Sequence, residues 1–113
     1  MSDFDIPIFK KTYELYKTFH ECLRFFPKQE KYTLGQKIEN VILEAMELIL
    51  QTIYSPKNTK SEIIRKVSRK IDLLKYLFRL AFETKSLNIK KYTTLEEMVI
   101  EIGKMVGGWL KSN

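Results

Sequence analysis

Apolar residues recur at spacings of three and four along four segments of this chain, a period that fits an α-helix and not a β-strand. Only three prolines and four glycines occur among the 113 residues, too few for a turn-rich β architecture. The repeats predict an all-α fold with helices at about residues 8–26, 33–54, 60–86 and 94–111.

Residues that favour helix ends flank these segments. Pro7 suits the first turn of the first helix, and Pro27 ends that helix before a polar connector, KQEK. The predicted N-caps are Thr33 for the second helix, Thr59 or Ser61 for the third, and Thr93 or Thr94 for the fourth, where Thr94 and Glu97 would form a capping box.

The connectors between the predicted helices are only about four to seven residues long. Because such loops cannot run the length of a bundle, neighbouring helices must be antiparallel. The sequence therefore predicts an up-and-down antiparallel four-helix bundle, and residues 1–113 form a single domain with no second unit.

Residues that could support chemistry are scarce. Cys22 has no disulfide partner and is expected to be a small apolar core residue in a reducing compartment. His20 is the only histidine, which excludes a di-iron centre, and its position two residues from Cys22 on a helix excludes a catalytic pair. With no phosphate-binding or hydrolase motif either, we expect no catalytic residue, no metal, no cofactor and no enzymatic activity.

The N-terminal string MSDFDIPIFKK lacks the basic start and continuous apolar run of a signal peptide. No run of about 18 uncharged apolar residues occurs, so no membrane-spanning helix is expected. These features predict a cytoplasmic protein that is not embedded in a membrane.

Positive charge is distributed unevenly along the chain. The net charge is +6, yet residues 1–58 hold eight Lys or Arg against eight acids, whereas the third helix holds eight against three. At 100° per residue this helix presents a basic stripe opposite its apolar face. The stripe and its flank supply the candidate nucleic-acid or polymerase contacts, Arg65, Lys66, Arg69, Tyr76 and Arg79. Arginine can fork onto phosphates and Tyr76 can stack on a base, but a solvated helix face remains the alternative.

Small residues mark the fourth helix. Gly103 and Gly107 lie four apart and Gly108 follows, although glycine is unfavourable inside a helix. The two interpretations are close packing on another helix of the chain and a contact between subunits. Trp109 is expected to anchor either kind of contact.

Three strings resemble a known family: YTLGQKIEN (32–40), KIDLLKYLFRLA (70–81) and EIGKMVGGWLKS (101–112). They are similar to the accessory variability determinant, Avd, of diversity-generating retroelements, over roughly residues 9–112. The most specific parts are the FP-K-x-E-K-Y-T-L-G entry to the second helix and the GGW ending. Lys37 and Lys104 stand where the family often has Arg, which keeps the charge.

The resemblance implies a four-helix protomer of a homopentameric barrel with a basic surface. It also implies association with the retroelement's reverse transcriptase and binding of RNA or DNA during mutagenic reverse transcription and retrohoming. The related bundles encoded in intervening sequences of 23S ribosomal RNA genes are an alternative with the same architecture. A purely structural protein-interaction bundle is a second alternative.

Overall fold

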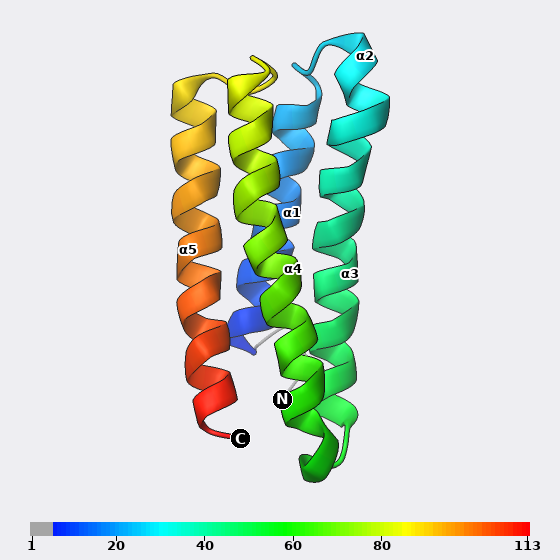
Figure 1. The fold of residues 1–113 in the computed structure, drawn as a ribbon, viewed down its shortest axis with the longest axis vertical. Coiled ribbons are helices and arrows are strands. Elements are labelled where there is room, and N and C mark those ends of the chain that lie inside the picture. Colours follow the sequence, from blue (N-terminus) through cyan, green and yellow to red (C-terminus); the bar gives the residue numbers. More distant parts are fainter. Residues whose placement is uncertain (1–5) are drawn as a thin grey trace.

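Four helical rods lie side by side in the computed structural model, which describes residues 6–113 (Figure 1). The first rod is α1, Pro7–Leu23. The second is a continuous run of three elements, α2 (Lys28–Glu30), the π-helical segment η2 (Lys31–Gly35) and α3 (Gln36–Tyr54). The third and fourth rods are α4, Lys57–Glu83, and α5, Ile89–Lys111.

The rods close into a ring in chain order. α3 packs on α4, α4 packs on α5, and α1 contacts both α3 and α5. Successive rods run in opposite directions (Figure 1), and residues 6–113 contain no strand. The prediction of an all-α, up-and-down four-helix bundle is confirmed.

The core follows from the apolar face of each helix. Phe19 of α1 and Phe78 of α4 are fully buried, and their ring centroids lie 5.8 Å apart. Burying an aromatic side chain of this kind contributes about 1.5–3 kcal/mol. Other side chains that are fully buried around them are Leu15, Ile38, Ile42, Ile49, Ile64, Leu74 and Leu95.

A proline precedes the first residue of two rods, the one that begins with α2 and the one formed by α4. Pro27 and Pro56 are the N-cap residues of α2 and α4, with ψ angles of 145° and 150°. A proline ring disfavours helical geometry in the residue before it, and Ser55 is accordingly extended. The helices therefore start directly after each proline, and the predicted starts at residues 33 and 60 are wrong.

The connector predicted between the first two helices is itself helical. α1 ends at Leu23 and not at residue 26, and helical geometry resumes at Lys28. Thr33 lies inside this second rod, where its hydroxyl donates to the carbonyl of Gln29 over 3.0 Å. Thr33 is therefore not an N-cap, because Pro27 had already started the helix.

Neither predicted cap of α4 acts as one. The Thr59 hydroxyl donates to the carbonyl of Pro56 over 3.0 Å, and the Ser61 hydroxyl donates to the carbonyl of Asn113 over 2.8 Å. Both groups are donors here, whereas an N-cap side chain accepts from a backbone amide. α4 ends at Glu83, three residues before the predicted end.

α5 begins five residues earlier than predicted. Asn88 is its N-cap, and the side-chain oxygen of Asn88 accepts from the amide of Lys91 over 2.8 Å. Thr94 is already inside the helix and donates to the carbonyl of Lys90 over 3.1 Å. The capping box predicted from Thr94 to Glu97 is therefore wrong, since the stronger asparagine cap lies upstream.

The π segment brings the second rod close to the turn after α1. Gly35 is buried, and a Cβ atom added there would collide with the Leu23 side chain. The same atom would lie 3.3 Å from the Glu30 carbonyl oxygen and 3.3 Å from Cδ2 of Phe26. Glycine is needed at this position because no side chain fits.

Candidate nucleic-acid and partner-binding face

α4 turns a basic face toward solvent. This helix carries eight Lys or Arg against three acids. All five candidate contact residues are exposed, Tyr76 with 71% of its surface. At 100° per residue Arg65, Arg69 and Tyr76 lie opposite the buried Val67, and Lys66 and Arg79 lie on the flanks of that face.

The cations of α4 differ in how far they are compensated. Arg79 pairs with Glu83 over 3.1 Å, Lys70 with Glu44 over 3.4 Å. Within residues 6–113, Arg65, Lys66 and Arg69 have no ion-pair partner. The uncompensated charge of the predicted set is therefore concentrated at residues 65–69.

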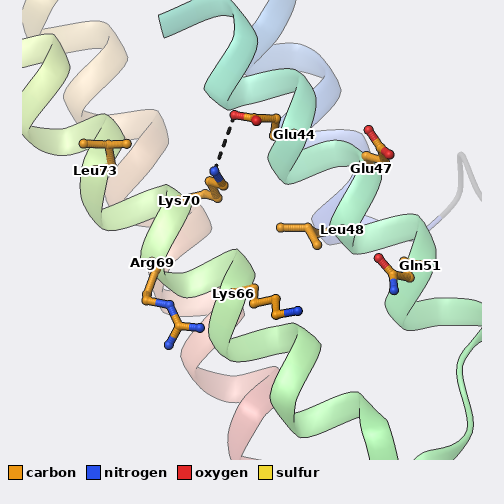
Figure 2. Close-up of a pocket in the computed structure, with 8 residues that line it drawn as sticks. All are labelled: Glu44, Glu47, Leu48, Gln51, Lys66, Arg69, Lys70 and Leu73. Carbon is orange, nitrogen blue, oxygen red and sulfur yellow. Dashed lines mark hydrogen bonds and ion pairs between the residues drawn. The ribbon is translucent and has the colours of Figure 1, made fainter. Parts of the chain in front are cut away.

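A hollow of about 480 Å³ lies between α3 and α4 (Figure 2). Lys66 extends from α4 toward α3, and Lys70 reaches Glu44 across the gap. One wall is basic and the other acidic, with a leucine on each side. The lining residues are Lys66, Arg69, Lys70 and Leu73 of α4 and Glu44, Glu47, Leu48 and Gln51 of α3.

Tyr76 and Arg79 lie on the other side of the α4 face, beside α5. They line a second hollow of about 540 Å³ together with Tyr92 and Glu96. The Tyr92 hydroxyl donates to Glu96 over 2.7 Å, and this hydrogen bond is the main reason that the pKa of Tyr92 is raised. The predicted contact residues are thus divided. Lys66 and Arg69 line the hollow on the α3 side, Tyr76 and Arg79 line the hollow beside α5, and Arg65 lines neither.

The glycines of α5 have different surroundings. A Cβ atom at Gly103 would lie 3.8 Å from Cγ2 of Ile71, an ordinary contact with α4. No atom lies within 4 Å of the corresponding position at Gly107 or Gly108. Packing within the described chain therefore does not explain Gly107. Trp109 is half-buried and lines a hollow of about 410 Å³ with Gly108 and other residues.

His20 and Cys22 have the ordinary surroundings predicted for them. His20 is exposed, its Nδ1 lies 3.1 Å from Glu39 Oε2, and its ring stacks on Tyr16. Cys22 is buried in the core, and desolvation raises the pKa of its thiol while the nearby Lys91 opposes that effect. No group of three metal-binding side chains is found among residues 6–113.

A second basic region was not predicted from the sequence. The connection after α1 and the connection between α4 and α5 both lie at one end of the bundle, at the top of Figure 1. Residues 24–32 and 84–91 together hold six Lys or Arg and one acid, Glu30. The strings RFFPKQEKY and TKSLNIKK carry this signal, which becomes visible once the antiparallel topology joins them.

The fold and its charged face define a small helical bundle with a basic helix, α4, whose cations are only partly paired with acids. No helix of the described part of the chain is long and apolar enough to cross a membrane. A family model described as bAvd-like matches residues 7–113, and the chain belongs to this family. The resemblance inferred from the three sequence strings is confirmed. A comparison with curated proteins found no match.

Proposed function

We propose that this chain is a non-catalytic accessory protein of a diversity-generating retroelement. It binds the reverse transcriptase and RNA or DNA in the cytoplasm, and so supports mutagenic reverse transcription and retrohoming. The observation that carries the proposal is the family match over residues 7–113, together with the unpaired cations at Arg65, Lys66 and Arg69.

The nucleic-acid part of the proposal rests on Arg65, Arg69, Tyr76 and Arg79, which we call the α4 ridge. Arg65 and Arg69 are one helical turn apart and free to fork onto phosphate oxygens. Each phosphate that such a group neutralises releases counterions, so the affinity depends steeply on salt. Arg79 and Tyr76 extend the ridge toward α5, where Tyr76 presents an exposed ring for stacking.

The hollow between α3 and α4 is better suited to a polypeptide than to phosphates. Glu44 and Glu47 on its α3 wall repel phosphate groups, whereas a protein surface offers charges of both signs. Leu48 and Leu73 add apolar area to the same hollow. We assign Lys66, Leu73 and the α3 wall of this hollow to contact with the reverse transcriptase, and Arg69 to phosphate contact.

Self-association as a homopentamer is the third part of the proposal. Gly107 gives α5 a smooth outer surface that the described chain does not cover, which suits the close approach of another subunit. Trp109 lies two residues farther along and is half-buried, so it can anchor that contact. Light scattering of the purified protein measures the assembly, and a stable monomer would contradict this part.

A charge-reversal pair of variants tests the α4 ridge. Arg65→Glu/Arg69→Glu/Arg79→Glu should weaken RNA or DNA binding and flatten its salt dependence by about one unit of slope per lost phosphate contact. The matched control is Lys10→Glu/Lys37→Glu/Lys111→Glu, which changes three exposed cations elsewhere by the same total charge. Equal losses in both variants would mean that net charge alone, and not the ridge, determines binding.

Co-purification tests the polymerase partner. The full chain should retain the reverse transcriptase encoded beside it, and Lys66→Glu/Leu73→Glu should reduce that retention while leaving the helical content unchanged. Failure of the parent chain to retain the enzyme would favour an intervening-sequence type of bundle or a purely structural one.

A further inference from the structure

The end of the bundle that holds the two upper connections is strongly cationic. We call its residues 24–32 and 84–91 the end cluster. Arg24 pairs with Glu21 over 3.3 Å. The other cations of the end cluster have no ion-pair partner within residues 6–113, and they are Lys28, Lys31, Lys85, Lys90 and Lys91.

Exposed aromatic rings lie among these cations. Phe25 is 65% exposed and Tyr32 is 68% exposed. The Lys91 ammonium lies 3.5 Å and the Arg24 guanidinium carbon 5.9 Å from the centroid of the Phe25 ring, yet most of the Phe25 side chain remains in solvent. The Lys91 contact joins the turn after α1 to the first turn of α5 and places positive charge against the partly exposed Phe25 ring.

The cations and the exposed rings of the end cluster together indicate the chemistry of its partner. Lysines without an ion-pair partner attract phosphates, and exposed rings offer stacking surfaces to unpaired bases. A duplex keeps its bases stacked inside and cannot use the rings, so single-stranded nucleic acid fits both features. The two shorter dimensions of the bundle are 23 and 21 Å, so its end can hold only a short segment.

We propose that the end cluster is a second nucleic-acid site, separate from the α4 ridge, that binds a short single-stranded segment of RNA or DNA. Phe25 and Tyr32 stack on its bases, and the unpaired lysines contact its phosphates. The inference is independent of the retroelement role and of the α4 assignment, since it rests on other residues.

Fluorescence anisotropy of the full chain tests the proposal with three labelled probes: a 12-mer of oligo(dT), a 12-mer of oligo(U) and a 12-base-pair DNA duplex. Phe25→Ala/Tyr32→Ala should weaken single-strand binding by about 10-fold or more and leave duplex binding unchanged, because each stacked base contributes roughly 5- to 150-fold. The salt slope should also stay unchanged, since no charge is removed.

Two further variants make the result specific. Tyr54→Ala removes a tyrosine that is 72% exposed at the opposite end of the bundle, and it should leave all three affinities as in the parent. Phe25→Trp keeps an aromatic ring beside Lys91 and should retain single-strand binding. Its emission should be quenched by oligo(dT), and Trp109 at the other end gives the parent signal for comparison.

Three outcomes overturn the proposal. One is single-strand affinity that does not change in Phe25→Ala/Tyr32→Ala while circular dichroism shows a folded protein. Another is an equal loss of duplex binding, which would indicate a general effect on the surface. The third is a blue shift of the Phe25→Trp emission with phosphatidylserine vesicles and no response to oligonucleotides, which would assign the end cluster to a lipid surface.

The α4 charge-reversal variant separates this proposal from the proposed function. If that variant keeps single-strand binding and the aromatic variant loses it, the end cluster is a site and the ridge is not. If the α4 charge-reversal variant loses single-strand binding and the aromatic variant keeps it, the α4 ridge is a site and the end cluster is not.

Discussion

The amide of Ser86 donates to the carbonyl of Ala81 over 2.8 Å and so closes the C-terminal end of α4. The amide of Lys85 donates to the carbonyl of Phe82 over 3.0 Å, which completes a Schellman motif. Such a motif needs a left-handed residue, and Lys85 has φ 67°. A side chain with a Cβ atom is therefore strained at the position where a Schellman motif usually has glycine.

Lys85→Gly should stabilise the protein by about 1 kcal/mol, because glycine adopts this conformation without a Cβ clash. The melting temperature should rise by about 4 °C. Lys85→Ala removes the same charge but keeps the Cβ atom, so it should leave the stability nearly unchanged. An equal gain in both variants would attribute the effect to charge and not to backbone strain.

Asn88→Ala should destabilise the protein by about 1 kcal/mol, because it removes the acceptor for the Lys91 amide at the start of α5. Urea denaturation measures the change in the free energy of unfolding. Thr94→Ala is the matched control, and it should be nearly neutral, since Thr94 donates to a carbonyl within the helix. A larger loss of stability in Thr94→Ala than in Asn88→Ala would support the capping box predicted from the sequence.

Gly35→Ala should destabilise the protein by about 1–3 kcal/mol, even though alanine usually favours a helix. The added methyl group collides with Leu23 and crowds Phe26, so the turn after α1 must move. Thermal denaturation gives the size of the effect. Stabilisation by Gly35→Ala would mean that the Leu23 side chain moves aside without cost.

Gly107→Ala is expected to stabilise the isolated chain by up to about 1 kcal/mol, because nothing lies within 4 Å of the new methyl group. If Gly107 contacts another subunit, the same variant should weaken the assembly. Thermal denaturation measures the change in stability, and light scattering at several protein concentrations measures the change in assembly. An assembly that does not change would remove Gly107 from the proposed subunit contact.

Cys22 should react slowly with a thiol reagent at pH 8 in the native protein and rapidly in guanidinium chloride. Burial raises the pKa of its thiol, so the reactive thiolate is disfavoured in the fold. The stabilising effect of the neutral thiol is complete below the unfolded-state pKa and is lost as the pH rises through the folded-state pKa. Equal rates in both states would contradict the burial of Cys22.

The helical period was enough to predict the core but not the helix ends. Phe19, Ile38 and Leu74 recur on apolar faces and are buried, because burial of a continuous face is what stabilises each helix. The ends depend on competition between nearby capping residues. Asn88 caps α5 and Pro27 is the N-cap residue of α2, and the spacing of apolar residues does not predict either position.

The candidate site was predictable in part for a similar reason. Exposure of Arg65 and Arg69 follows from their angle to the apolar face of α4 alone. The hollow beside Lys66 does not follow, since it requires the position of Glu44 on α3. The end cluster combines segments about 60 residues apart, and only the antiparallel topology brings them together.

The π segment at Lys31–Gly35 makes the second rod tolerant of a change in length. A π turn holds one more residue than an α turn, so the rod contains the equivalent of a single-residue insertion. The wider π turn absorbs this extra residue, so deleting one residue from the segment would return the rod to a regular α-helix while the residues on both sides of it keep nearly the same orientation. The second rod can therefore lose or gain one residue at this segment without turning the apolar face of α3 away from the core.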